Sequence, residues 1–129
     1  METIFTKIIN GEIPSYKIAE DEKFLAILDA SPLVKGHTLV IPKKPTDKIF
    51  DIETEDFKEL FSFAQKVAKK IEKAVDCKRV GLAVIGLEVP HAHIHLIPIN
   101  KMDDMNFKNS RLIFSKEEYE QTQNLIKNP

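Results

Sequence analysis

Residues 89–98 read Val-Pro-His-Ala-His-Ile-His-Leu-Ile-Pro and hold three of the four histidines of the chain. In an extended strand successive side chains point to opposite faces, so the three histidines share one face and the apolar residues between them share the other. A helix would turn the imidazoles about 200° apart at each step of two residues. The stretch therefore predicts a strand with one face in the core and one face available for chemistry. The three histidines are His91, His93 and His95.

Neutral histidine is a nucleophile and a metal ligand, and its protonated form is a general acid, with the change of charge at about pH 6.5. A row of three can divide these roles. The alternative is that some of them are ordinary exposed or hydrogen-bonded strand residues. The strict alternation and the apolar opposite face favour a functional row.

Length and composition predict a single domain over residues 1–129, which is long enough for a real core and too short for two domains. The net charge is −1, with 30% charged residues of both signs. Binding of long nucleic acids depends on neutralising many phosphates, so they are not expected as partners, whereas a mononucleotide is not excluded. The single cysteine, Cys77, rules out an internal disulfide and fits a reducing compartment. The longest apolar stretch, residues 80–87, is far below the ~20 residues that span a bilayer, so a cytoplasmic protein without membrane contact is expected.

Periodicity predicts the remaining elements. A short helix is expected at residues 3–9, a hairpin of strands at 16–20 and 24–29, and a further strand at 37–42. A long helix is expected at residues 55–75, with Thr54 as its cap. A strand at 80–85 should join the histidine strand through a tight turn at Gly86-Leu87-Glu88. A last helix is expected at 116–127, where Ser115 and Glu118 form a capping box.

These elements predict an α+β protein with a five-stranded antiparallel sheet, one long helix on a face and short helices at the ends. Between the sheet and the last helix, residues 100–111 are polar and irregular, with Met102, Met105 and Phe107 as hydrophobic anchors.

The fourth histidine, His37, begins a predicted strand, so it can meet the histidine row across the sheet if the two strands pair. A zinc site is one reading of such a group. The Cα atoms of His91 and His95 would be about 13 Å apart, too far to share one ion comfortably. At most two adjacent histidines of the row could join His37, with Asp29 as the only obvious further ligand.

Other catalytic arrangements are missing from the sequence. No Gly-x-Ser-x-Gly motif exists, Cys77 is remote from the histidines in sequence, and the four glycines are isolated rather than gathered in a phosphate loop. Histidine is then the best nucleophile on offer, attacking phosphorus to form a phospho-imidazole.

The segment from Pro90 to Ile97 resembles the histidine triad motif, His-x-His-x-His with apolar residues between. The likeness continues, in matching order and spacing, through residues 4–9, 12–14, 29–32 and 36–43, and it covers nearly the whole chain down to Pro98. The protein is therefore identified as similar to the histidine triad (HIT) superfamily, in its nucleotide-binding Hint-like branch.

The resemblance implies a HIT-like fold that forms a homodimer, with the two five-stranded sheets joined. It also implies attack on the α-phosphorus of a purine nucleotide derivative, such as an AMP or GMP phosphoramidate, through a nucleotidyl-histidine intermediate that hydrolyses to a nucleoside monophosphate. His93 would be the nucleophile, His95 would bind the phosphate and protonate the leaving group, and the carbonyl of His91 would orient His93. No metal or other cofactor is implied for this step.

The same resemblance assigns supporting roles to further residues. His37 would support the histidine network and Asp29 would hold the ribose hydroxyls. The residues implied to wall the base pocket are Ile4, Phe5, Ile8, Ile27 and Ala30.

One segment departs from the family pattern. Members usually carry an Asn-x-Gly and then a Gly-Gln-Ser ahead of the triad, and here the Asn has no counterpart, Leu87 takes the Gln position and Glu88 the Ser position. Three functions therefore stay open: a nucleoside phosphoramidase or related nucleotide hydrolase, a nucleotide-binding module with residual activity, and a zinc-dependent hydrolase or metal-binding protein.

Overall fold

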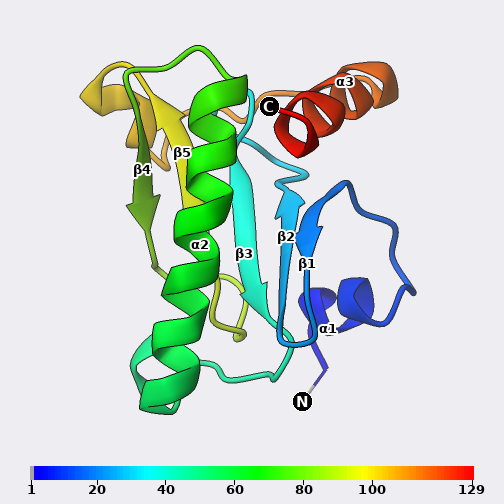
Figure 1. The fold of residues 1–129 in the computed structure, drawn as a ribbon, viewed down its shortest axis with the longest axis vertical. Helices are drawn as coiled ribbons and strands as arrows, with labels where there is room; N and C mark the ends of the chain where they lie inside the picture. Colours follow the sequence, from blue (N-terminus) through cyan, green and yellow to red (C-terminus); the bar gives the residue numbers. More distant parts are fainter. Residues whose placement is uncertain (1) are drawn as a thin grey trace.

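A five-stranded antiparallel sheet organises the computed structural model, which describes residues 2–129 (Figure 1). The strand order is β1-β2-β3-β5-β4. The predicted α+β class with one long helix and short terminal helices is confirmed. In chain order the elements are α1 (Ile4–Ile9), β1 (Lys17–Glu20), β2 (Phe24–Leu28), β3 (Thr38–Pro42), a 3₁₀ turn at Ile49–Asp51, α2 (Thr54–Ala74), β4 (Arg79–Ala83), β5 (Ile94–Ile99), a 3₁₀ turn at Met102–Met105 and α3 (Lys116–Lys127).

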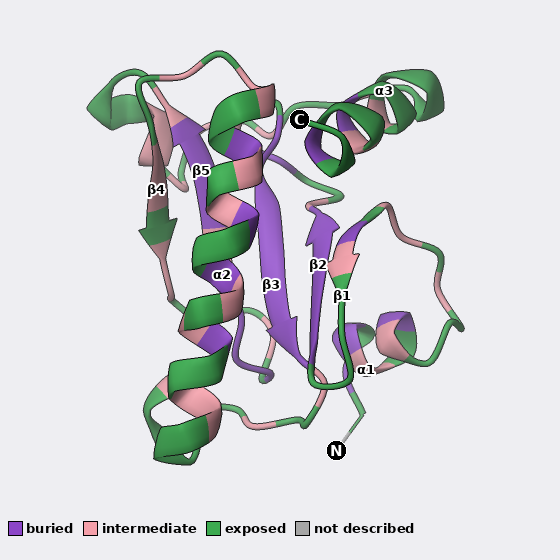
Figure 2. Cartoon of the chain, in the orientation of Figure 1, coloured by how far each residue is buried: buried purple, intermediate pink, exposed green. Residues whose placement is uncertain are grey.

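Two apolar clusters cover the two faces of the sheet. On one face α2 lies along the strands and buries a stripe at helical spacing against Ile94 and Leu96 of β5 (Figure 1). On the opposite face α1 buries Phe5 and Ile8 against residues of β2 and β3. Consequently every residue of β2 and β3 is buried (Figure 2). The buried stripe of α2 consists of Leu60, Ala64, Val67 and Ile71.

The helix ends follow local capping chemistry, with one correction. Ser115 and Glu118 form the predicted capping box of α3. The prediction that Thr54 caps the long helix is wrong, because the Phe57 N–H already bonds the carbonyl of Glu53, over 2.8 Å. Thr54 is therefore the first helical residue, and the N-cap position is Glu53, which makes no side-chain cap. No helix within residues 2–129 is long and apolar enough to cross a membrane.

The predicted tight turn between the last two strands is also wrong. β4 ends at Ala83 and β5 begins at Ile94, so residues 84–93 form a long connection rather than a hairpin turn. The reason is that the residues ahead of β5 bond elsewhere: the Ala92 N–H donates to the Thr46 carbonyl over 2.7 Å, and Pro90 has no N–H to give. The bond from Ala92 to Thr46 holds the first part of the histidine motif against the loop after β3.

Candidate active site

The histidine row begins ahead of β5 and ends within it. His91 and His93 precede the strand, and His95 is its second residue, so the predicted strand over the whole motif is too long. The division of faces nevertheless holds, since Ile94 and Leu96 pack under α2 while the ring of Phe5, on the other face, contacts both His91 and His93. The rings of His93 and His95 lie 5.0 Å apart.

The proton on His93 is positioned by a main-chain carbonyl. His93 Nδ1 lies 2.8 Å from the carbonyl oxygen of His91. A carbonyl can only accept, so Nδ1 carries the hydrogen and Nε2 of the neutral ring keeps a free lone pair. The side chain is buried, and the ring of Phe5 lies edge-on against it. His93 is thus held with its hydrogen on Nδ1 and with Nε2 turned away from this bond, as a nucleophilic nitrogen requires.

A main-chain carbonyl also positions the ring of His91. Its Nε2 donates to the carbonyl of Pro42 over 2.7 Å, and its Nδ1 lies 3.4 Å from the Thr3 hydroxyl, which is therefore the donor of that weaker contact. Burial lowers the pKa of His91, which keeps the ring neutral. The ring is fully buried and has no path to a substrate, so His91 acts on the site through its carbonyl.

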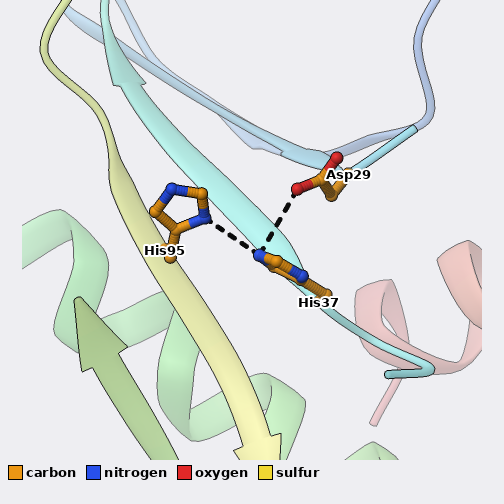
Figure 3. A group of neighbouring side chains, drawn as sticks. All are labelled: Asp29, His37 and His95. Carbon is orange, nitrogen blue, oxygen red and sulfur yellow. Dashed lines mark hydrogen bonds and ion pairs between the residues drawn. The ribbon is translucent and has the colours of Figure 1, made fainter. Parts of the chain in front are cut away.

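His37 connects the row to the end of β2 (Figure 3). The Leu33 N–H donates to its Nδ1 over 3.0 Å, so the ring hydrogen sits on Nε2. That Nε2 lies 2.9 Å from Nδ1 of His95 and 3.4 Å from a carboxylate oxygen of Asp29. His95 accepts the closer bond at Nδ1 and therefore carries its own hydrogen on Nε2, the other side of its ring.

Burial also keeps His37 and His95 uncharged in the free protein. It lowers the pKa of His37 to about 4, against the opposing effect of the Asp29 carboxylate. It lowers the pKa of His95 to about 3, with the positive charge that His37 would carry as a second cause. At pH 7 the Asp29 carboxylate thus lies beside a neutral His37 ring, and the contact is not an ion pair.

A glycine makes the position of His37 attainable. Gly36 has a φ of 90°, and a Cβ on it would lie 3.0 Å from Val75 and 3.3 Å from Pro98. A larger residue would be strained in this conformation and would also meet two side chains. Gly36 therefore allows the chain to turn into β3 with His37 facing His95.

Asp29, His37 and His95 are close enough to be considered as a metal site, with one ligand atom from each lying within 4.8 Å of the others. The hydrogen bonding of His37 fits a metal poorly. Its Nε2 could bind a cation only if the hydrogen moved to Nδ1, where the Leu33 N–H already donates. The group is better suited to holding protons in place.

The residues implied to bind the nucleotide divide by exposure. Asp29 follows β2, where the Ser31 N–H bonds one carboxylate oxygen and the Tyr119 hydroxyl bonds its carbonyl, over 2.8 and 2.9 Å. Ile4 and Ala30 are exposed and can contact a ligand directly. Three others, Phe5, Ile8 and Ile27, are buried in the cluster under α1.

Two residues at the site were not predicted as part of it. The ring of Phe107 lies edge-on to His95, with 5.0 Å between centroids, and 6.4 Å from His37. The guanidinium of Arg111 lies 5.6 Å from the centre of the Phe107 ring. The sequence marked Phe107 only as a hydrophobic anchor in a polar segment, and nothing in the pattern signalled Arg111.

The connection that departs from the family pattern is open to solvent. Leu87 is 89% exposed, Glu88 is exposed, and Gly86 has a φ of 76°. Within residues 2–129 neither Leu87 nor Glu88 makes a side-chain hydrogen bond or ion pair. Val89, the next residue, packs against the cluster under α1 and so brings this loop to the histidine face.

The sheet, the two covering layers and the histidine row with fixed ring hydrogens define a histidine triad protein. The model of the HIT domain family matches residues 10–102, and the chain belongs to this family.

Three relatives place the chain within the family. It is 36% identical to the adenosine 5'-monophosphoramidase of Schizosaccharomyces pombe over 99 residues, 76% of this chain and 74% of that protein. A protein of Sulfolobus tokodaii described as a hypothetical histidine triad nucleotide-binding protein has a crystal structure that superposes with a TM-score of 0.82, at 35% identity, covering 96% of this chain and 89% of the other. A zinc-bound histidine triad family protein of Mycobacterium smegmatis superposes with a TM-score of 0.81, at 30% identity, covering 98% and 94%.

Proposed function

We propose that this protein hydrolyses purine nucleoside phosphoramidates or related nucleoside 5'-phosphate derivatives and releases the nucleoside monophosphate. One observation carries the proposal. The His91 carbonyl holds the hydrogen of His93 on Nδ1 and leaves Nε2 free as a nucleophile, and the ring centroids of His93 and His95 are 5.0 Å apart. A buried imidazole with one nitrogen held by a carbonyl and a second imidazole beside it suits covalent catalysis at phosphorus.

In the first step Nε2 of His93 attacks the α-phosphorus, forming a P–N bond while the bond to the leaving group breaks. An amine leaves poorly unless it is protonated. The negative charge of the bound phosphate raises the pKa of His95 and the nearby Asp29 carboxylate compensates its charge, so His95 takes up a proton from solvent at Nδ1. Nδ1 then no longer accepts the hydrogen of His37 Nε2, which is left facing the Asp29 carboxylate. The proton on His95 Nε2 then passes to the departing nitrogen.

In the second step a water molecule attacks the nucleotidyl-His93 phosphorus. After the first step His95 has a free lone pair on Nε2, and it removes the proton from the water as the new P–O bond forms. The P–N bond to His93 breaks, the nucleoside monophosphate leaves, and His95 releases its extra proton to solvent, so that both histidines return to their starting state. No metal takes part in either step.

The named relatives support the nucleotide as ligand, since one is a monophosphoramidase and another a nucleotide-binding protein. We assign the ribose hydroxyls to Asp29, whose carboxylate lies at the end of β2 beside His37. The base would lie along α1 and the end of β2. Its contacts would be Ile4, Phe5, Ile8, Ile27 and Ala30.

The second candidate is a nucleotide-binding module with residual activity. It is favoured by the exposed loop, which offers Leu87 and Glu88 where polar groups would contact phosphate. A carboxylate near a bound phosphate weakens binding and slows transfer by repulsion. This function predicts AMP binding with negligible turnover.

A zinc-dependent hydrolase is the third candidate, raised again by the zinc-bound relative. The fixed hydrogen on His37 Nε2 argues against it at the Asp29, His37 and His95 group. This function predicts zinc that survives dialysis and activity that a chelator abolishes.

We also propose a cytoplasmic homodimer that forms through β4, the edge strand of the sheet. Leu82 of this strand is 48% exposed, and a groove of about 480 Å³ runs between β4 and α2. An unpaired edge strand beside an apolar groove suits pairing with a second copy. Light scattering at micromolar concentration should give twice the chain mass for the wild type and less for Leu82→Lys, and a wild-type monomer would overturn the dimer. Cytoplasmic location rests on the single cysteine.

The deciding experiment is release of AMP from adenosine 5'-phosphoramidate in the presence of EDTA, by the wild type and by His93→Ala. Turnover that vanishes in the variant, together with an AMP adduct on wild-type His93 in quenched samples, supports the hydrolase. Wild-type binding of AMP without turnover supports the binding module. Loss of wild-type turnover with EDTA supports the zinc enzyme.

A further inference from the structure

The segment that follows β5 returns to the histidine row and brings a positive charge with it. Phe107 lies edge-on against His95, and the Arg111 guanidinium lies over the Phe107 ring. Arg111 Nη1 also donates to the carbonyl of Ser31 over 2.9 Å. These two contacts hold the guanidinium at one face, against Phe107, and at one edge, through the N–H bond to Ser31.

The main chain holds this arrangement at the Asp29 end of the site. The Leu112 N–H bonds the carbonyl of Pro32 over 2.9 Å, directly beside the Arg111–Ser31 contact. The charge of Arg111 is near enough to contribute to the lowered pKa of both His37 and His95. Arg111 therefore belongs to the surroundings of the site, although it follows the family domain in sequence.

The arrangement leaves most of the guanidinium available. A guanidinium has five N–H donors, and the described contacts use one of them. The side chain is only partly buried. A planar, immobilised fork of this kind suits bidentate binding of a phosphate, which a flexible lysine would not match.

The position of Arg111 indicates which phosphate it would bind. Phe5 contacts the ring of His93, whereas Phe107 contacts His95 and His37. Arg111, which lies over Phe107, is therefore attached to the His95 and His37 end of the row, whereas Phe5 packs against His93. A group bound there is separate from the phosphorus that His93 attacks.

We infer that Arg111, held by Phe107 and Ser31, recognises a second phosphoryl group of the nucleotide ligand. The inference rests on the proposed nucleotide function and narrows its substrate class. The second phosphate has two possible sources: the β-phosphate of a nucleoside 5'-diphosphate unit, where it is part of the leaving group, or a 3'-phosphate on the ribose beside Asp29.

The test compares three ligands by calorimetry on the full chain with EDTA: AMP, α,β-methylene-ADP and adenosine 3',5'-bisphosphate. The wild type should bind one of the two doubly phosphorylated ligands about tenfold more tightly than AMP, and which one it prefers identifies the source. In Arg111→Gln this affinity ratio should fall towards one, and Arg111→Lys should retain part of it. Lys108→Gln removes an exposed charge in the same segment and should keep the full ratio.

The outcomes separate this inference from the function on which it rests. A wild type that binds AMP as tightly as both other ligands, or an Arg111→Gln variant that loses affinity for all three by the same factor, overturns phosphate recognition. The second result, together with a lower melting temperature, would show that Arg111 serves only to hold the segment after β5 in place. A wild type that binds none of the three overturns the nucleotide function itself and the inference with it.

Discussion

The ring of Phe5 lies edge-on against the ring of His93, with 4.8 Å between their centroids and 69° between their planes. Through this contact α1, which is implied to wall the base, also sets the orientation of the nucleophile. Phe5 therefore links the packing of α1 to the position of Nε2 of His93.

Replacing Phe5 by Leu should reduce the rate of AMP release more than it reduces binding. The leucine preserves apolar volume but loses the edge contact, which is worth about 0.5–1.5 kcal/mol for an aromatic pair, so a two- to tenfold lower kcat is expected. Single-turnover kinetics measures this directly. Ile41→Leu, a buried residue of the same apolar cluster with no assigned role in the site, serves as the control, and an equal loss in both variants would argue against the linkage.

Replacing His37 by Ala should lower both stability and turnover. The Leu33 N–H and His95 Nδ1 would lose their partner in a buried position, at a cost of about 1–3 kcal/mol for each unsatisfied group. Turnover should fall because the hydrogen of His95 is no longer held on Nε2. Urea unfolding and kcat give the two readouts. Full turnover in a destabilised variant would show that His37 serves packing alone.

The stability of the fold should fall as the pH drops from about 6.5 towards 4. Burial lowers the pKa of His37 to about 4 and that of His95 to about 3, both below the value of an unfolded histidine, about 6.5. Between these pH values the unfolded chain binds more protons than the folded one, so the free energy of unfolding rises with pH. The stability linked to the two histidines is complete above the pKa of the unfolded chain. The loss is on the order of 3 kcal/mol for each histidine.

Urea unfolding at pH 7.5, 6 and 5 checks this dependence. The carboxylates with lowered pKa values, such as Glu20, titrate mostly below this range and contribute little to it. The double variant His37→Gln and His95→Gln should have a flatter profile. An unchanged slope in that variant would assign the pH dependence to other groups.

Neutralising Glu88 should speed AMP release. Its carboxylate is exposed on the loop that Val89 brings to the histidine face, so it interacts with a phosphate across solvent. In water such repulsion amounts to less than about 1 kcal/mol, and Glu88→Gln should raise kcat/KM about two- to fivefold at low salt. The gain should shrink at about 0.5 M salt, because exposed charges are screened. Glu72→Gln, on α2, is the matched control, and a gain of the same size there would point to net charge instead.

Added zinc should leave the Asp29, His37 and His95 group unchanged. Binding there would require the hydrogen of His37 to move towards the Leu33 N–H. Equilibrium dialysis of the wild type and of Asp29→Asn should therefore retain the same amount of zinc. Less zinc on the variant would establish this group as a ligand set.

The sequence predicted the elements whose residues repeat regularly. The stripe of α2 and the alternation of His95 with Ile94 and Leu96 place those faces correctly, because helical and strand periods depend only on neighbours in the chain. The length of the connection over residues 84–93 could not be read, since it depends on bonds from Ala92 to Thr46 and from His91 to Pro42.

The sequence predicted the histidines of the site but not the residues that surround them. The triad and His37 stand in a motif, whereas Phe107 and Arg111 lie in a polar segment with no period. Their approach to His95 depends on the tertiary bonds of Arg111 to Ser31 and of Leu112 to Pro32. The hydrogen positions also needed coordinates, because they follow from which atom faces each ring nitrogen.

The atoms that position the ring hydrogens of His37, His91 and His93 come from the main chain: the Leu33 N–H, the Pro42 carbonyl and the His91 carbonyl. Every amino acid supplies a carbonyl, and every one except proline supplies an N–H. Positions 33 and 42 can therefore change identity over time without disturbing the histidines, provided that the path of the backbone persists. An alanine scan would miss both partners, and Leu33→Pro is the single-residue change that would remove the donor to His37.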